Sequence, residues 1–311
     1  MLEAVDLHKS FQSNHAVQGV SLHLAAGESV GLVGPNGAGK STTIAMLSTL
    51  LKPDKGDVLL NGRSVTDDPA PLRALLGVVP QDIALYPELT AEENLRFFGS
   101  LYGLRGSSLS AAVDSALELV ALSDRRHEQI RKYSGGMKRR INIAAALLHD
   151  PKLVIMDEPT IGVDPQSRNH ILESVRTLNR ERGMSVLYTS HYMEEVEQLC
   201  DRIYVMDHGA IIAAGTKTEL KDLISEEITI QLQADGPVDQ LISHLQNLAG
   251  TRSVTSTEPG SVRFIASARP ELLAEVIRAA EVAGTALSGL NLERPSLEDV
   301  FLHLTGRTLR D

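Results

Sequence analysis

The stretch Gly34-Pro35-Asn36-Gly37-Ala38-Gly39-Lys40-Ser41 decides the fold, because it matches the P-loop pattern G-x-x-x-x-G-K-S. Backbone N–H groups of such a glycine-rich turn point inward and hold phosphate oxygens. Lys40 adds a positive charge for the outer phosphates, and the Ser41 hydroxyl can bind Mg²⁺. We therefore expect these residues and the following Thr42 to hold a nucleotide, with Lys40 also acting in catalysis.

Apolar runs and helical patterns around this loop predict an α/β fold wound on a largely parallel sheet. A buried strand at Ser29–Val33 enters the loop, and a helix over Lys40–Leu51 leaves it with its N-terminus facing the phosphates. Further buried strands are expected at Leu75–Val79, Leu153–Met156, Ser185–Thr189 and Arg202–Met206. Further helices are expected at Ala91–Tyr102, Leu109–Leu119, Gly135–Leu148, Pro165–Arg182 and Met193–Leu199. Antiparallel hairpins are expected around Leu2–His8, Val17–Leu24 and Asp57–Leu60, with Asn61-Gly62 as a type I′ turn.

The pattern changes near Lys221–Glu227, and the rest of the chain predicts a second, smaller α+β domain. Its expected elements follow the order βαββαβ, which is the ferredoxin-like order, and end in one more helix. They are strands at Ile228–Leu232, Arg252–Ser256, Ser261–Ser267 and Ala286–Leu292, and helices at Pro237–Leu248, Pro270–Ala283 and Leu297–Thr305. Pro237 suits the first position of its helix, and Ser296 is expected to cap the last one. The predicted domains are therefore 1–222 and 223–311.

Composition and charge narrow the class of protein. The chain has 311 residues, of which 42% are hydrophobic and 23% charged, as in a globular protein. Its formal net charge of −10 argues against a protein that coats nucleic acid. No apolar run is long enough to span a membrane, and the start does not have the pattern of a signal peptide. The single cysteine, Cys200, excludes an internal disulfide and suits a reducing compartment, so we expect a cytoplasmic protein.

Further elements narrow the choice among kinases, GTPases and helicases, which a P-loop alone leaves open. Leu153–Asp157 is an apolar strand ending in a carboxylate that can hold Mg²⁺, and Glu158 can polarise a water as a general base. Ser134-Gly135-Gly136 opens a helix with exposed N–H groups, a hydroxyl and the positive end of the helix dipole, which makes a second phosphate site. A single nucleotide can use both phosphate sites if the second comes from another copy of the protein.

Two polar residues follow predicted parallel strands, at the edge where such sheets bind ligands. His191 comes after Ser185–Thr189, and Gln81 comes after Leu75–Val79 and Pro80. Taken alone, each is as well explained as an ordinary loop side chain, so the residues themselves leave both roles open.

In the order and spacing of these elements, residues 1 to about 220 resemble the ATP-binding subunit of an ABC transporter. The matching motifs are the P-loop Gly34–Ser41, the Q-loop Gln81, the signature Ser134–Gly136, Walker B Leu153–Asp157 with Glu158, the D-loop Gly162-Val163-Asp164 and the switch histidine His191. The resemblance implies a P-loop NTPase of the ABC cassette type. Such a cassette has a RecA-like parallel core, an antiparallel β subdomain and a helical subdomain, here at about 82–150.

The resemblance also implies roles for single residues. Two subunits would pair head to tail, each binding ATP between its own P-loop and the signature of its partner. Phe11 would stack on adenine, although a phenylalanine is also commonly a core residue. Asp164 would reach across the dimer to the partner's site, and His191 would contact the γ-phosphate. The implied catalytic residues are Glu158, His191, Lys40 and Gln81, and the implied Mg²⁺ ligands are Ser41, Gln81 and Asp157.

The chain departs from the commonest signature, Leu-Ser-Gly-Gly-Gln, at Tyr133 and Met137, and it carries Ile161 where a small or polar residue is frequent. This variant and the ending Pro295-Ser296-Leu297-Glu298-Asp299-Val300-Phe301 resemble the daunorubicin-resistance group of drug exporters. The implied function is an ATPase that powers export of a drug or lipid-like substrate through a separate membrane permease. Asp82–Asn94 would contact that permease at the inner face of the cell membrane. An importer ATPase, and an ABC-type ATPase acting on DNA or the ribosome, remain alternatives.

One basic run invites a different interpretation. Arg125–Arg140 holds seven Lys or Arg residues and one acid, a composition that can indicate nucleic-acid binding. The run also surrounds Ser134–Gly136, where a basic field would attract ATP. We favour the nucleotide explanation and expect no nucleic-acid partner.

Overall fold

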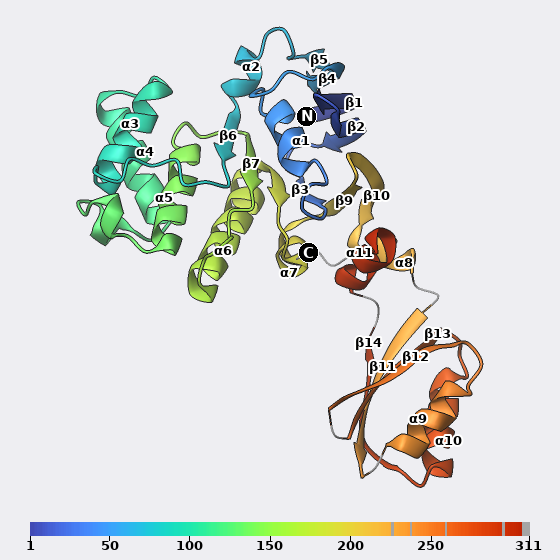
Figure 1. Ribbon diagram of the computed structural model, residues 1–311. Coiled ribbons are helices and arrows are strands. Elements are labelled where there is room, and N and C mark those ends of the chain that lie inside the picture. The colour runs from blue at the N-terminus through green and yellow to red at the C-terminus, as the bar shows by residue number, and fades with distance from the viewer. Residues whose placement is uncertain (225–226, 237, 259, 294–295, 307–311) are drawn as a thin grey trace. The chain divides into compact units, whose positions relative to one another are not determined.

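The computed structural model describes residues 1–224, 227–236, 238–258, 260–293 and 296–306 (Figure 1). The chain forms two compact units, Met1–Thr216 and a second unit that begins at Lys217. The short helix α8, Lys217–Asp222, falls in the second unit, whereas the boundary predicted from the sequence places residues 217–222 in the first domain. That 1–222 and 223–311 are functional domains stays a prediction. Among the described residues, no helix is both long and apolar enough to cross a bilayer.

A mostly parallel sheet forms the centre of the first unit. Its strand order is β10-β9-β3-β8-β7-β6, and only the β9–β10 pair is antiparallel. The strands are β3 (Ser29–Val33), β6 (Leu76–Val79), β7 (Leu153–Asp157), β8 (Ser185–Thr189), β9 (Arg202–Asp207) and β10 (Ala210–Thr216). Every residue of β3, β7 and β8 is buried, as expected for parallel strands covered on both faces. The predicted parallel core is therefore confirmed, and β10 is an edge strand that the sequence did not indicate.

An antiparallel sheet of order β2-β1-β4-β5 lies beside this core. Its strands are β1 (Leu2–Phe11), β2 (Asn14–Leu24), β4 (Lys55–Leu60) and β5 (Arg63–Ser64). The two-residue turn between β4 and β5 has positive φ at both Asn61 (50°) and Gly62 (76°). That combination is the one a type I′ turn requires, so this prediction is confirmed.

Four helices of the first unit follow strands or loops of the central sheet. They are α1 (Lys40–Leu47), α2 (Ala70–Arg73), α6 (Pro165–Arg182) and α7 (Met193–Leu199). The predicted extent of the first helix, Lys40–Leu51, is wrong at its end. The helix stops at Leu47 because Ser48 is its C-cap and Thr49 has a φ of 60°, which a continuing right-handed helix cannot contain.

The helical segment between β6 and β7 has a hydrophobic core of its own. It contains α3 (Ala91–Leu101), α4 (Gly106–Leu119) and α5 (Gly135–Leu147), with single 3₁₀ turns at Ser123–Arg125 and Ile130–Lys132. Helix α4 begins three residues before the predicted Leu109, so that prediction is wrong at its start. Thr90 and Glu93 form a capping box that fixes where α3 begins.

The second unit contains the predicted βαββαβ order. Its antiparallel sheet has the order β12-β13-β11-β14, with helices between the strands as the ferredoxin-like pattern requires. The elements are β11 (Glu227–Asp235), α9 (Asp239–Gln246), β12 (Thr251–Glu258), β13 (Ser261–Ser267), α10 (Leu272–Val282), β14 (Ala286–Glu293) and α11 (Leu297–Thr305). Ser296 caps α11 as predicted, whereas Pro237 and Pro295 lie outside the described residues.

A core substitution should destabilise the second unit alone. Phe264 on β13 is fully buried in a cluster with Leu232 and Val276, so Phe264→Ala should lower the free energy of unfolding of this unit by about 3–5 kcal/mol. Hydrogen exchange read by mass spectrometry checks this, since the chain has no tryptophan to report on unfolding. Peptides from β11 and β13 should exchange faster, while Leu290→Ala, at a side chain 37% exposed, should change little. Equal effects of the two variants would contradict the assignment of the core.

Candidate nucleotide site

The P-loop follows β3 and packs so closely against its neighbours that two of its glycine positions have no room for a side chain. A Cβ on Gly34 would lie 2.3 Å from the carbonyl oxygen of Met206, and one on Gly39 would lie 2.3 Å from that of Ala16. Gly39 also has a φ of 102°, which side chains disfavour. The loop therefore lies against β2 and the end of β9, and its backbone amides at the start of α1 remain available to an anion.

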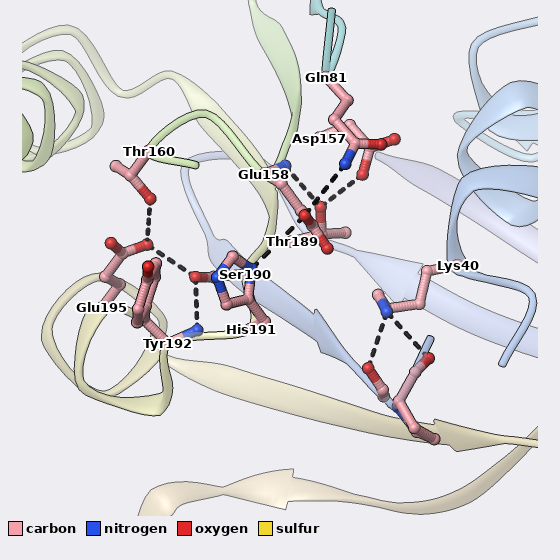
Figure 2. Close-up of polar contacts among 12 residues, drawn as sticks. Lys40, Gln81, Asp157, Glu158, Thr160, Thr189, Ser190, His191, Tyr192 and Glu195 are labelled. Atoms are coloured by element: carbon pink, nitrogen blue, oxygen red, sulfur yellow. Dashed lines mark hydrogen bonds and ion pairs between the residues drawn. The ribbon is translucent and has the colours of Figure 1, made fainter. Parts of the chain in front are cut away.

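Lys40 is the first residue of α1, at the end of this loop, and is only 7% exposed. Its Nζ donates to the carbonyl oxygens of Gly34 (2.7 Å) and Pro35 (3.1 Å) (Figure 2). Burial lowers the pKa of Lys40, and the charges of Glu158 and Asp157 oppose that shift. The lysine is thus held across the loop by neutral carbonyls, which phosphate oxygens can replace as stronger, charged partners.

A cavity of about 580 Å³ opens in front of the loop, large enough for a nucleotide. Phe11 lines it and is 49% exposed, so this phenylalanine is on the surface and not in the core. Pro35 and Gly34 do not line the cavity, but they hold Lys40 at its floor. The lining residues are Phe11, Asn14, His15, Ala16, Gln18, Asn36, Gly37, Ala38, Gly39, Lys40, Ser41, Thr42, Gln81, Glu158, His208 and Gly209.

The carboxylate of Asp157 is fixed at the end of β7 by a buried hydroxyl from the next strand. Thr189 Oγ1 donates to Asp157 Oδ1 over 2.7 Å and accepts the backbone N–H of Glu158 over 2.9 Å (Figure 2). Thr189 is fully buried, so these bonds have no competition from water. The sequence places Thr189 only inside a strand, and nothing in its surroundings marks it as part of the site.

Glu158 is held by the two strand-end residues whose roles the sequence left open. Gln81 Nε2 donates to Glu158 Oε2 over 3.3 Å, and His191 Nδ1 lies 3.5 Å from the same oxygen. Glu158 has a φ of 46°, a strained conformation for a residue with a side chain, and such strain often occurs at functional sites. The structure thus joins Gln81, Glu158 and His191 in one cluster beside the cavity.

The signature segment lies elsewhere in the first unit. Ser134 caps α5 by accepting the N–H of Met137, and Asp164 caps α6 by accepting the N–H of Ser167. A Cβ on Gly136 would lie 2.4 Å from Ser167 Oγ and 2.9 Å from Asp164 Oδ2, so the two caps adjoin and Gly136 must be glycine. The bond from Ser167 lowers the pKa of Asp164. Among the described residues that line the P-loop cavity, none comes from 134–136 or 164.

A buried carboxylate that the sequence did not indicate fixes the loops around His191. Glu195 on α7 is 2% exposed, and its Oε2 accepts bonds from Thr160 (2.7 Å) and Ser190 (2.7 Å) (Figure 2). The same oxygen accepts a bond from the hydroxyl of Tyr188 (2.8 Å). Burial raises the pKa of the Tyr188 hydroxyl well above its ordinary value, and the nearby Glu195 adds to the shift. Because Ser190 precedes His191 and Thr160 follows Glu158 closely, this network holds the backbone on both sides of the cluster.

The arginines of the basic run 125–140 have partners inside the first unit. Three of them are in ion pairs with acidic side chains, and two more point inward and donate to backbone carbonyls. The paired residues are Arg125 with Glu128, Arg126 with Glu92 and Asp114, and Arg131 with Glu88, and the inward ones are Arg139 and Arg140. That a basic field around the signature attracts ATP stays a prediction.

The donors beside the cavity fit Mg²⁺. Ser41 offers a hydroxyl, Gln81 an amide oxygen and Asp157 a carboxylate, and hard oxygen ligands are those Mg²⁺ prefers. Within the described part of the chain, no group of three or more His, Cys, Asp or Glu side chains could hold a metal ion.

Comparison with a family model and comparison with individual proteins indicate the same family. A family model described as ABC transporter matches residues 17–161. The chain is 48% identical over 312 residues to the linearmycin resistance ATP-binding protein LnrL of Bacillus subtilis (strain 168), covering 100% of both chains. It is 39% identical to the daunorubicin resistance ATP-binding protein DrrA3 of Streptomyces coeruleorubidus, covering 96% of this chain and 93% of that protein.

One of the similar solved structures is a dimer. The ATP-binding cassette MJ0796, in a dimeric post-hydrolysis state bound to ADP and Pi, is 26% identical and superposes with a TM-score of 0.65. The match covers 70% of this chain and 98% of that one. The resemblance to ABC ATP-binding subunits of the drug-resistance group, inferred from motifs, is therefore confirmed.

Thr189→Val should show what the buried hydroxyl does. The change keeps the shape of the side chain but leaves Asp157 and the Glu158 N–H without their partner, so ATP turnover should fall about tenfold or more. Thr189→Ser, which keeps the hydroxyl, is the matched control and should retain most activity. Steady-state phosphate release measures both, with melting temperatures to confirm folding. If the valine variant turned over as fast as the serine variant, Thr189 would have no part in the site.

Proposed function

The chain belongs to the ABC transporter family of ATP-binding proteins, and we propose that it acts as a homodimer that hydrolyses MgATP to drive export through a separate membrane permease. ATP binding and hydrolysis follow from the family. The homodimer, the Mg²⁺ ion, the residue roles and the membrane partner are the proposed parts.

The proposal of a homodimer rests on one observation. The chain has a P-loop cavity and a second phosphate-type helix end at Ser134–Gly136, and the two do not meet within one copy. Gly136 adjoins Asp164, so both residues would be presented together to a partner. Two copies related by a twofold axis complete both sites at once, because each supplies what the other lacks. The dimeric cassette among the solved structures supports this arrangement.

In the proposed reaction a water attacks the γ-phosphorus of ATP, and the bond to the bridging oxygen breaks. Glu158 would accept the proton of that water, since its carboxylate adjoins the cavity and is held there by Gln81 and His191. Lys40 would exchange its carbonyl partners for phosphate oxygens. Mg²⁺, held by Ser41, Gln81 and Asp157, would neutralise charge on the phosphates.

Nucleotide position would follow from the lining of the cavity. The backbone of Gly34–Ser41 and the side chain of Thr42 would surround the phosphates, with Phe11 free to stack on the base at the outer end. In the assembled dimer, Ser134–Gly136 and Asp164 of the partner would complete the site. His191 would reach the γ-phosphate from its place beside Glu158.

Export through a permease is supported by the names of relatives and by one exposed surface. The two relatives described above are named for resistance to linearmycin and to daunorubicin, which suits removal of a drug or lipid-like compound from the cell. Tyr86 and Phe97 are 48% and 40% exposed and touch edge to face within or next to the segment 82–94. An exposed aromatic patch of this kind marks a protein contact, so we assign it to the permease at the inner face of the cell membrane.

Glu158→Gln should abolish hydrolysis while keeping ATP binding. The amide retains the shape and can still bond to its neighbours, but it cannot accept the proton of the water, so turnover should fall by at least about 10²-fold. Affinity for a fluorescent ATP analogue should stay close to wild type, and gel filtration with ATP should show a stable dimer. Glu173→Gln, at an exposed carboxylate on α6, is the control. Near-normal turnover in the Glu158 variant would remove this residue from the mechanism.

Mixing two inactive variants tests the composite site. Lys40→Ala removes the P-loop charge, and Ser134→Arg should block the partner's phosphates. A heterodimer of the two contains one complete site, made from the Lys40 of one copy and the Ser134 of the other. Random pairing then predicts recovery of roughly a quarter of wild-type turnover. A mixture no more active than either variant alone would argue against a site shared between copies.

A further inference from the structure

Arg139 is a buried cation that the residue roles above leave unused. It lies on α5, five positions after the Ser134 cap, and is only 4% exposed. Burial lowers the pKa of its guanidinium, and Asp82 opposes the shift. Removing a guanidinium from water is costly unless its donors are satisfied, so the partners of Arg139 show what this position needs.

Those partners are backbone carbonyls of the Q-loop. Nη1 of Arg139 donates to Pro80 O over 2.8 Å, and Nη2 donates to Gln81 O over 2.6 Å. Three residues further along the same face of α5, Asn142 Oδ1 accepts the N–H of Ala84 over 3.2 Å. The signature helix is therefore hydrogen-bonded to the backbone of 80–84 at three points. Two of these bonds come from the planar guanidinium of Arg139.

The far end of this contact is the catalytic cluster. The side chain of Gln81, whose backbone Arg139 holds, bonds to Glu158 through Nε2. The near end of α5 is Ser134–Gly136, which in the proposed dimer faces the nucleotide of the partner. A continuous set of bonds thus runs from the helix that serves the partner's nucleotide to the carboxylate that serves the chain's own nucleotide.

We propose that Arg139 is a positioning residue that couples the signature helix to Gln81, so that the partner's nucleotide influences the placement of Glu158. The inference rests on the proposed homodimer and goes beyond it, since the composite site needs no particular link inside each copy. Lysine cannot replace Arg139, because a single ammonium on a flexible stem does not bond to two carbonyls in a fixed plane.

The neighbouring arginine offers a matched control. Arg140 donates through Nη1 to the carbonyl oxygen of Val120, at the end of α4, and so bonds to a different part of the helical segment. A lysine at position 140 can still donate to the single carbonyl of Val120. A lysine at position 139 cannot donate to the carbonyls of Pro80 and Gln81 in the same plane, so Arg139→Lys loses the paired bonds. Asn142→Leu removes the third point of attachment without touching a charge and gives a second variant should Arg139→Lys fold poorly.

Steady-state ATPase kinetics, binding of a fluorescent ATP analogue and melting temperatures test the proposal. Arg139→Lys should lower kcat about tenfold with KM within about twofold, and Asn142→Leu should lower kcat in the same direction. Arg140→Lys should remain close to wild type. A coupled role predicts one further result. In a Gln81→Ala background, Arg139→Lys should change kcat less than about twofold, because the side chain through which Arg139 acts is gone.

Two results would overturn the inference. One is wild-type turnover in Arg139→Lys, and the other is a full, additive loss when it is combined with Gln81→Ala, which would indicate that the arginine only stabilises the fold. Failure of the proposed homodimer is read separately, from gel filtration of Glu158→Gln with ATP. A stable ATP-dependent dimer together with either result above leaves the proposed function intact and rejects the role of Arg139.

Discussion

The register of three parallel strands is the constraint on which the site depends. Leu32 of β3 and Asp157 of β7 both pair with Thr189 of β8, so the three strands end at one level of the sheet. The P-loop, Glu158 and the Ser190–His191 loop each begin at that level, as is general for ligand sites at the carboxyl ends of parallel strands. A one-residue slip of β8 would turn Thr189 away from Asp157 and leave two buried polar groups without a partner.

Most of the surrounding structure holds these strand ends in place. Gly34 and Gly39 let the P-loop approach the backbone of β2 and β9 where a side chain would clash. Glu195 accepts hydrogen bonds from three hydroxyls behind the His191 loop. Because Glu195 is buried, these hydrogen bonds are strong and costly to break. Lys40, Asp157 and Glu158 are all buried, so the environment of these charged groups is set by neighbouring side chains more than by solvent.

The helical segment adds a different kind of control. It has its own hydrophobic core, and α5 connects that core to the Q-loop through Arg139 and Asn142. A segment with a separate core can shift as a body, and bonds to the backbone of 80–84 would carry such a shift to Gln81. The same segment exposes Tyr86 and Phe97. The exposed aromatic surface and the signature helix therefore lie in one helical segment, and α5 bonds that segment to the Q-loop.

The sequence by itself determined the parallel strands of the central sheet and the ferredoxin-like order, and it marked Lys40, Asp157 and Glu158 as candidate site residues. Glycine spacing, buried apolar runs and polar residues at strand ends are local signals, and they need no knowledge of distant neighbours. Only the tertiary structure decided that Thr189 bonds to Asp157, that Glu195 bonds to Thr160, and that Arg139 points inward to the Q-loop. The reason is that these partners lie 32, 35 and 58 residues away in the chain. A threonine in a strand or an arginine on a helix has the same local pattern whether it meets water or a buried carboxylate or carbonyl.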